Sequence, residues 1–522
     1  MPGNPKEIEL KLAVTPADIG ALKIHPTFAE LLSSPVRTEI LNSVYFDTDQ
    51  SDLRDHGLTL RVRRKGDQFI QTIKSVRSPG SVFERDEWET PLQDGQPDFD
   101  AAANTALEPV LTPQVRATLR PIFETRIRRS LFHLADNTWQ IEIAFDEGEI
   151  VAGNRVLPIS EIELELKYGY RAALFELARM IVEAVPARLV LTAKSERAYA
   201  LIEDKPEQFF HAQNVEIVPG STSGQAFQSV ARDCLRQLLA NVPFMHRRNP
   251  EALHQIRVAL RRLRTAISVF AEIIRDGQVE RIKAELKWLS RELSPARDYD
   301  TLFDEVLAPL RQQHPDHHGL KSLVFSFARE RLRGYLSAEK ALQSQRFSRL
   351  LVETFAWIEI GEWITTTDET ARLRRNRLIE TYAADQLTRR RRKIKKRGRA
   401  LVKLDPARRH KLRIQVKKAR YATEFFANLF QEKKATRRSA KLLAALKRLQ
   451  NSLGGLNDIA ARKDLCTNIL SGHGHMRNGA DGRDRAFAAG LVTGNQEARR
   501  SELLADAVKA YAQLEDVKPF WK

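Results

Sequence analysis

The sequence predicts a multidomain chain of α and β structure. An N-terminal antiparallel β-barrel with flanking helices is followed by an all-α pair of pseudo-symmetric four-helix bundles. Three observations lead to this prediction. The 522 residues are too many for one ordinary domain. Short alternating apolar and polar runs fill the chain up to about residue 205, whereas helical periodicity dominates beyond residue 224. The helical part also contains an internal repeat.

The N-terminal part contains about eight short strand-like runs, which is typical of a closed or curled antiparallel sheet. We expect strands at residues 7–11, 43–46, 58–63, 68–74, 84–90, 125–132, 139–145 and 161–167. We expect helices at residues 16–22, near 114–119 and at 171–185. These elements define a domain of residues 1–205. Residues 206–223 follow as a linker, because the run from Pro219 to Gly224 is rich in Gly and Ser.

The helical domain, residues 224–515, divides into repeats of about residues 224–380 and 381–515. Asn249-Pro250 stands 156 residues before Asp405-Pro406, and each pair is typical of a helix N-cap followed by proline in the first turn. The same offset relates His254 to His410, Arg257 to Arg413, Arg261 to Lys417 and Arg264 to Arg420. Two related bundles about a pseudo-twofold axis would explain this repeat.

Charge is unevenly distributed along the chain. Residues 1–210 contain 25 Lys and Arg against 33 Asp and Glu, whereas the rest contains 60 against 34. The helical part should therefore attract a polyanion. The two cysteines, Cys234 and Cys466, are too few for a disulfide framework, and a reducing cytosol fits them. No run of about 18 apolar residues occurs, so we expect no membrane insertion.

Two strands carry several carboxylates and one lysine on a single face, because alternate strand residues point the same way. The two sets are Glu7, Glu9 and Lys11, and Glu161, Glu163, Glu165 and Lys167. Divalent cations such as Mg²⁺ prefer oxygen ligands. The arrangement predicts a divalent-metal site beside an anion site.

Cations on further strands keep the same parity. They are Arg61 with Arg63, Arg85 beside Glu87 and Glu89, and Arg126 with Arg128, while Lys74 and Lys194 add to them. Guanidinium groups suit bidentate binding of phosphate oxygens, and lysine supplies a compact charge. No glycine-rich phosphate loop is present, so side chains would hold the anion.

As an ordered set, these motifs resemble the CYTH family of triphosphate tunnel metalloenzymes over about residues 4–203. The motifs are Glu7-x-Glu9-x-Lys11, Tyr45-Phe46-Asp47, Leu60-Arg61-Val62-Arg63, Thr72-Ile73-Lys74, Arg85-x-Glu87-x-Glu89, Glu161-x-Glu163-x-Glu165 and Lys194-Ser195-x-Arg197. The family includes inorganic, thiamine and RNA triphosphatases and class IV adenylyl cyclases.

The resemblance implies hydrolysis of inorganic triphosphate with Mg²⁺ or Mn²⁺. It implies metal ligands at Glu7, Glu9, Glu163 and Glu165, which together with Lys11 form the expected catalytic set. It implies phosphate binding by Lys11, Arg61, Arg63, Lys74, Arg85, Arg126, Arg128 and Lys194. Second-rank candidates, which could equally be structural charge partners, are Glu87, Glu89, Asp146 and Glu161.

On a helical wheel, His254, Arg257, Arg261 and Arg264 fall within roughly 80°, apart from an apolar stripe. The repeat places His410, Arg413, Lys417 and Arg420 in the same way, and the two stripes could line one cationic groove. These residues resemble the CHAD family over about residues 224–515, whose members are associated with binding inorganic polyphosphate. The resemblance makes all eight residues candidate polyphosphate ligands. Each histidine could donate to phosphate when protonated, or cap its helix when neutral.

We therefore expect a cytoplasmic enzyme, in association with polyphosphate granules, whose partners are inorganic triphosphate and inorganic polyphosphate. One alternative is a nucleoside or thiamine triphosphatase, or a cyclase, which would need aromatic stacking positions. A second is a non-catalytic, granule-associated polyphosphate-binding protein, but polyanion binding alone needs no carboxylate cluster. A nucleic-acid binder would need a reading motif or interleaved aromatics, so we expect no specific nucleic-acid partner.

Overall fold

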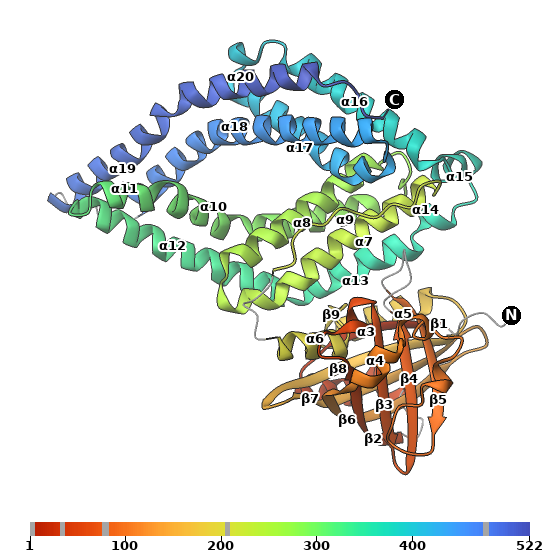
Figure 1. Cartoon of the computed structure of the whole chain (residues 1–522). Helices are drawn as coiled ribbons and strands as arrows, with labels where there is room; N and C mark the ends of the chain where they lie inside the picture. The colour runs from red at the N-terminus through yellow and green to blue at the C-terminus, as the bar shows by residue number, and fades with distance from the viewer. Residues whose placement is uncertain (1–5, 32–36, 76–82, 204–208, 473–479, 522) are drawn as a thin grey trace. The chain divides into compact units, whose positions relative to one another are not determined.

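A computed structural model describes residues 6–31, 37–75, 83–203, 209–472 and 480–521. The chain forms two compact units (Figure 1). The barrel unit combines the chain up to Phe209 with Gln343–Ile360. The helical unit combines Phe210–Leu342 with Gly361–Lys522.

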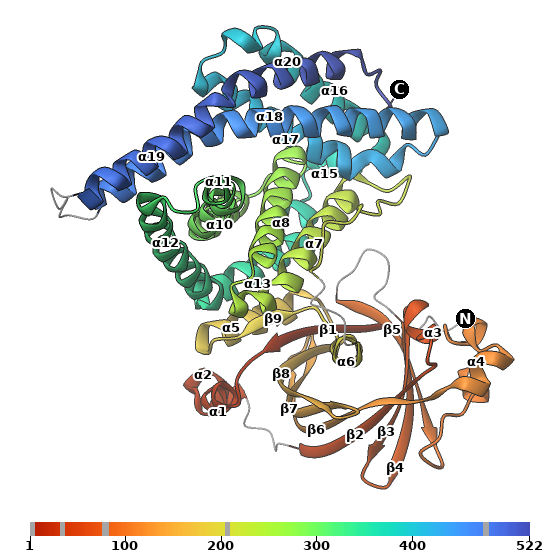
Figure 2. The same cartoon turned by 60° about the vertical axis from the view of Figure 1, so that its left-hand side comes forward.

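The barrel unit is built on a closed antiparallel sheet (Figure 2). Its strands are β1 (Lys6–Ala13), β2 (Arg37–Asp47), β3 (Leu58–Lys65), β4 (Gln68–Ser75), β5 (Glu84–Leu92), β6 (Arg120–Ala135), β7 (Gln140–Ala152), β8 (Arg155–Tyr168) and β9 (Arg188–Val190). The order is β5-β4-β3-β2-β6-β7-β8-β1, and pairing of β1 with β5 closes the ring. The short β9 pairs with the end of β1. The predicted antiparallel barrel is confirmed.

Helices of the barrel unit connect the strands and fill part of its interior. They are α1 (Pro16–Ile24), α2 (Pro26–Leu31), α3 (Asp52–Asp55), α4 (Pro113–Thr118), α5 (Ala172–Ala184) and α6 (Lys194–Ile202). The unpredicted α6 contributes Ala198 and Tyr199 to a buried apolar cluster with Leu41, Tyr45 and Phe123. Leu41 and Tyr45 of this cluster also line the charged cavity of the barrel, so the cluster forms part of its wall.

One helix of the barrel unit comes from far downstream in the sequence. This helix, α13 (Gln345–Ile360), packs against α5. The ring of Phe355 contacts that of Phe83 at 5.3 Å between centroids, and Arg179 of α5 donates to Glu353 at 3.0 Å. Sequence analysis placed these residues in the helical domain. Because α13 covers an apolar face of α5, it belongs to the core of the barrel unit.

The helical unit contains α7 (Ser223–Asn241), α8 (Pro250–Val269), α9 (Val279–Glu292), α10 (Ser294–Leu302), α11 (Ala308–Gln313), α12 (His318–Gln343), α14 (Glu362–Thr365), α15 (Glu369–Arg375), α16 (Ile379–Gly398), α17 (Pro406–Phe426), α18 (Lys433–Gly472), α19 (Ala480–Ala498) and α20 (Arg500–Asp516). The predicted all-helical C-terminal part is confirmed. No helix in the described part of the chain is long and apolar enough to cross a membrane.

The helix pairs α7–α8 and α16–α17 follow the predicted repeat, because each begins 156 residues after its counterpart. The repeat-related rings of Phe270 and Phe426 contact each other at 5.8 Å. The predicted N-caps are also present. Asn249 accepts hydrogen bonds from two backbone N–H groups of α8, and Asp405 accepts one from the Arg408 N–H at 2.7 Å.

The segment predicted as a linker, residues 206–223, packs within the helical unit at Val215 and Ile217, which are buried. Residues 204–208 lie outside the described residues, and coil follows to residue 221. Arg262 donates to the carbonyl of Gln213 at 3.1 Å. Thr222 caps α7 by accepting from the Gln225 N–H. The Gly- and Ser-rich residues therefore form a turn and the start of α7.

Candidate active site

The inner faces of the barrel strands enclose a cavity of about 260 Å³. Nine acidic side chains line it: Glu7, Glu9, Glu39, Glu87, Glu89, Glu142, Asp146, Glu163 and Glu165. Nine basic side chains face them: Lys11, Arg61, Arg63, Lys65, Lys74, Arg85, Arg129, Lys167 and Lys194. Buried charges are stabilised by pairing with opposite charges, and most of these side chains form ion pairs with one another.

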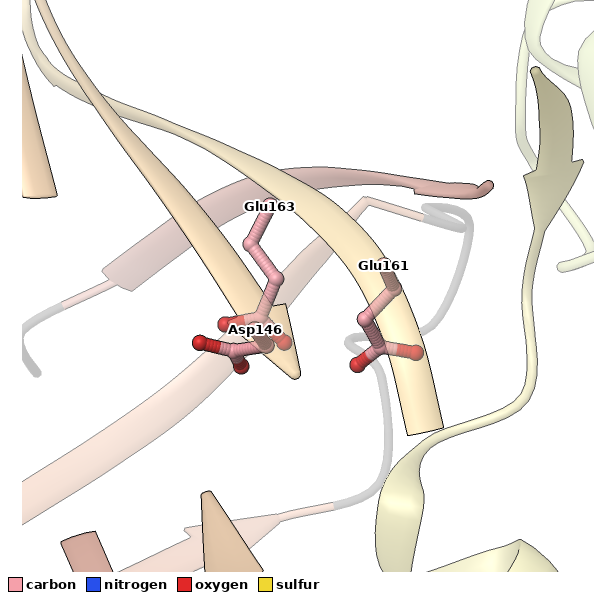
Figure 3. Close-up of side chains that lie close together, drawn as sticks. All are labelled: Asp146, Glu161 and Glu163. Atoms are coloured by element: carbon pink, nitrogen blue, oxygen red, sulfur yellow. The ribbon is translucent and has the colours of Figure 1, made fainter. Parts of the chain in front are cut away.

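Three buried carboxylates from β7 and β8 point toward one another (Figure 3). In Asp146, Glu161 and Glu163, one carboxylate oxygen from each lies within 4.8 Å of the others. The strand register explains this grouping, since Asp146 lies opposite Glu161 and Glu163 follows on the same face. An all-oxygen set of this kind fits Mg²⁺ or Mn²⁺.

This carboxylate cluster is neutralised by four cations, Lys11, Arg129, Lys194 and Arg197. Arg129 binds Asp146 through two hydrogen bonds of 2.7 and 2.6 Å, and it also reaches Glu163 at 2.5 Å. Lys194, at the start of α6, donates to Asp146 at 2.7 Å and to Glu163 at 2.8 Å. Since like charges this close repel, the cations offset the repulsion between the carboxylates.

A second group of carboxylates lies on β1. Arg85 donates to both Glu7 and Glu9 across the closure of the barrel. Lys74 donates to Glu7 at 2.9 Å. Lys11 donates to Glu9 at 2.9 Å and also to Glu163. Lys11 therefore joins the carboxylates of β1 to the cluster on β7 and β8.

The carboxylates of the cavity differ in proton affinity. Burial raises the pKa of Glu9, and the charge of Glu163 raises it further. Burial raises the pKa of Glu165 to about 7. For Glu163, the charges of Lys11 and Lys194 outweigh burial and hold its pKa well below the usual range. Such divergent environments are typical of sites that handle both protons and charge.

Arg61 and Arg63 of β3 differ in how well they are neutralised. Arg61 lies 3.7 Å from Glu87 and 4.0 Å from Glu89. Arg63 donates to the Ser43 hydroxyl at 3.2 Å, and no carboxylate among the described residues lies within ion-pair distance. Burial and the charge of Arg61 lower the pKa of Arg63 to about 10. Arg63 is therefore a cation available to an incoming anion.

Ten of the twelve first-rank predicted residues of the barrel line this one cavity: Glu7, Glu9, Lys11, Arg61, Arg63, Lys74, Arg85, Glu163, Glu165 and Lys194. Of the four predicted metal ligands, Glu163 belongs to the close carboxylate cluster. Its companions Asp146 and Glu161 were second-rank candidates. Glu165 lies opposite Glu9 on the neighbouring strand and pairs with Lys167 at 2.6 Å.

The placement of Arg126 and Arg128 in the cavity was wrong. Both are exposed on the outer face of β6, where Arg126 pairs with Glu124 at 3.3 Å. The inward residue is Arg129, which the sequence analysis missed. Adjacent strand residues face opposite ways, so Arg128 and Arg129 cannot both point inward. The pairing of Arg129 with Asp146 on β7 selects the inward one, and that register is a tertiary feature.

In the helical unit, the two predicted basic stripes approach each other. We call them the paired stripes: His254, Arg257, Arg261 and Arg264 on α8, and His410, Arg413, Lys417 and Arg420 on α17. Arg261 lies 3.5 Å from the Tyr421 hydroxyl of the opposite helix. Arg257 donates to Ser294 at 2.7 Å, and His410 bonds Asn457 at 2.9 Å. Arg420 is already engaged by Glu424 at 2.7 Å.

Lys417 shows how crowded the cations of the paired stripes are. Burial and the charges of Arg413 and Arg261 lower the pKa of Lys417 to about 7. Arg257, on the opposite helix, contributes in the same direction. Burial and Arg297 likewise lower the pKa of His254 to about 4. A bound anion would offset the repulsion between cations that lower one another's pKa in this way.

Comparisons with known proteins find a family match for each of two parts of the chain. Residues 5–199 match the family model of the CYTH domain, and residues 229–467 match that of the CHAD domain. An inorganic triphosphatase from Haemophilus influenzae is 29% identical over 197 residues, which are 38% of this chain and 55% of that protein. The chain thus matches about half the length of this curated relative.

Two solved structures are also similar. The CHAD domain from the plant Ricinus communis is 27% identical, with a TM-score of 0.49, covering 60% of this chain and 98% of that chain. A Hippeastrum protein described as a putative adenylyl cyclase with a dominant triphosphatase activity is 15% identical with a TM-score of 0.29. That match covers 37% of this chain and 95% of the Hippeastrum chain.

Proposed function

We propose that the barrel hydrolyses inorganic triphosphate and that the helical unit binds inorganic polyphosphate, because these parts match the CYTH and CHAD family models. The observation that carries the first part is the cavity lined by equal numbers of carboxylates and cations. A site for a polyanion alone would need the cations only. The similarity to an inorganic triphosphatase supports the same reaction.

Asp146, Glu161 and Glu163 would hold Mg²⁺ or Mn²⁺, with Glu7, Glu9 and Glu165 as further proposed ligands. A bound divalent cation would supply Lewis acidity at a phosphoryl oxygen. Occupation of the carboxylates would release Lys11, Arg129 and Lys194 from their present ion pairs. The freed cations, with Arg63, would then bind phosphate oxygens and stabilise the charge that develops during transfer to water.

The lining of the cavity supports triphosphate without an attached base. Among the described lining residues, Tyr45 is the single aromatic, and its ring stacks on Phe123 at 4.5 Å. A nucleotide or thiamine group would need a free aromatic or apolar surface. We therefore propose inorganic triphosphate as the substrate in preference to nucleoside and thiamine triphosphates.

Polyphosphate binding by the helical unit is supported by the paired stripes. Their cations lie on two facing helices, where burial and the charges of basic neighbours lower the pKa of Lys417. A flexible chain with a charge on every phosphate could follow such a double row. A cytoplasmic location with recruitment to polyphosphate granules stays part of this proposal. The thiols of Cys234 and Cys466 are free and buried, which is compatible with a reducing compartment.

The test is phosphate release from inorganic triphosphate, ATP, thiamine triphosphate and long-chain polyphosphate, each with and without Mg²⁺ or Mn²⁺. We expect the highest kcat/KM on inorganic triphosphate and loss of turnover when a chelator is added. A higher kcat/KM on ATP or thiamine triphosphate would replace the proposed substrate. If none of the four compounds is hydrolysed, the barrel binds phosphate compounds without hydrolysing them.

A further inference from the structure

A second cavity, of about 180 Å³, lies in the helical unit between the end of α8, α16 and α17. We call it the α16 pocket. It is lined by Ser268, Val269, Ala271, Glu272, Gln386, Arg389, Arg390, Lys393, Gln415 and Lys418. Four of these residues are cationic and one is acidic, and that carboxylate, Glu272, is engaged by Arg389. The pocket is therefore strongly positive.

Two cations of the α16 pocket, Arg390 and Lys418, are held in place by neutral groups. Buried Arg390 donates to the side-chain oxygen of Gln386 at 2.6 Å, while its buried Nε has no hydrogen-bond partner among the described residues. Lys418 donates to the Ser268 hydroxyl at 3.0 Å. Burial lowers the pKa of Arg390 to about 10, and burial with the charges of Arg390 and Lys393 lowers the pKa of Lys418. An anion would relieve both effects.

At the equivalent place in the first repeat, the corresponding cation is paired with an acid. At the offset of 156 residues, Arg389 corresponds to Asp233, Lys393 to Gln237 and Lys418 to Arg262. Arg262 pairs with Asp233 at 3.0 Å and with Gln237 at 2.9 Å, and it donates to the carbonyl of Gln213 in the packed connecting segment. Arg262 of the first repeat is thus neutralised by Asp233 and covered by the connecting segment. The second repeat replaces its acid and amide by two cations and keeps a cavity.

We propose that the α16 pocket binds a phosphate group that carries close to two negative charges, either free orthophosphate or the terminal phosphate of a polyphosphate chain. Guanidinium groups and lysine are the side chains that recognise such a group. The cavity is several times larger than the roughly 30 Å³ that one water molecule takes up in the liquid, so it has room for a tetrahedral anion. The assignment depends neither on hydrolysis in the barrel nor on the paired stripes, because none of their residues lines the pocket.

The first experiment is calorimetric titration of orthophosphate into the full chain in metal-free buffer. The pocket variant combines Lys393→Gln with Lys418→Gln. The matched control combines Arg392→Gln with Lys396→Gln, which removes two exposed charges from α16 outside the pocket. We expect affinity to fall at least about tenfold in the pocket variant and to stay at the wild-type value in the control. Equal affinity in the two variants would overturn the proposal.

A second variant guards against loss of folding. Arg389→Asp with Lys393→Gln rebuilds the side chains of the first repeat, so Lys418 gains an acidic partner in place of an anion. We expect this variant to melt at or above the wild-type temperature in the absence of phosphate. Addition of orthophosphate should raise the Tm of the wild type more than that of the variant. An equal rise in both would contradict the proposal.

Competition distinguishes the two sources of the phosphate group. Linear triphosphate has terminal phosphates, whereas cyclic trimetaphosphate has none. Displacement of orthophosphate by the linear compound alone would assign the pocket to chain ends, and displacement by neither would assign it to orthophosphate. Equal displacement by both would show that the pocket responds to total charge, which would overturn the proposal.

Discussion

At the residue scale, Arg128 and Arg129 give the sharpest test of the site, because they are adjacent and face opposite sides of β6. Arg129 binds Asp146 and Glu163, whereas Arg128 is exposed. We expect Arg129→Gln to lower kcat for triphosphate by about 10²–10³, the usual effect of removing one group that stabilises transition-state charge. Arg128→Gln should remain close to wild type. The measurement is steady-state phosphate release, with melting curves to verify folding. Comparable kcat in the two variants would remove Arg129 from the site.

Lys417 makes a second prediction at this scale. Its pKa of about 7 lies below that of an ordinary lysine, so the ammonium is lost as pH rises through neutrality. The groups that face it, Arg413, Arg261, Arg257 and Arg420, stay charged. Polyphosphate affinity should therefore weaken by up to about tenfold between pH 6 and 8.5 at fixed ionic strength.

Lys417→Arg is the matched control for this pH dependence, because arginine keeps its charge over the whole range. The variant should bind polyphosphate at pH 8.5 nearly as well as at pH 6. Any titration of the polyphosphate itself affects both proteins equally. If wild type and Lys417→Arg lose affinity in parallel, Lys417 does not contact the chain.

At the scale of elements, α13 is the feature with the largest consequence. Phe355 is fully buried and packs on Phe83, so α13 contributes to the barrel core. Phe355→Ala should destabilise the barrel unit by about 3–5 kcal/mol. The check is the temperature at which triphosphate hydrolysis is lost. Phe325→Ala, at an exposed position of α12, should leave that temperature unchanged. Equal inactivation temperatures for Phe355→Ala and wild type would show that α13 is dispensable.

The elements themselves were largely predictable, because strand alternation and helix capping are local. The strands at residues 7–11 and 161–167 and the caps at Asn249 and Asp405 all follow from neighbouring residues. The three residues of β9 are too few to show a pattern, and the residues of α6 were interpreted only as a binding motif. Register was the missing information. It decides that Asp146 and Glu161 join Glu163, because opposed residues on paired strands share a face.

At the scale of the whole molecule, the repeat in the sequence was a good guide to the helical unit, since repeat-related Phe270 and Phe426 meet. The division of the chain was harder to foresee. Nothing local to residues 345–360 distinguishes a helix that packs on α5 from one that packs among its neighbours in sequence. The contrast between the repeats, Asp233 against Arg389, was visible in the sequence, but the cavity was not.

The central claim is that hydrolysis belongs to the barrel and polyphosphate binding to the paired stripes. One comparison of two full-length variants tests it directly, by measuring triphosphate turnover and polyphosphate affinity on the same samples. Glu163→Gln removes one carboxylate of the buried cluster. The other variant replaces Arg257, Arg261, Arg413 and Lys417 together by Gln.

We expect Glu163→Gln to lose nearly all metal-dependent turnover, by at least about 10², while it binds polyphosphate like the wild type. The fourfold variant should keep its turnover on triphosphate and lose most polyphosphate affinity at fixed, near-physiological ionic strength. Undiminished turnover in Glu163→Gln, or unchanged polyphosphate affinity in the fourfold variant, would contradict the account.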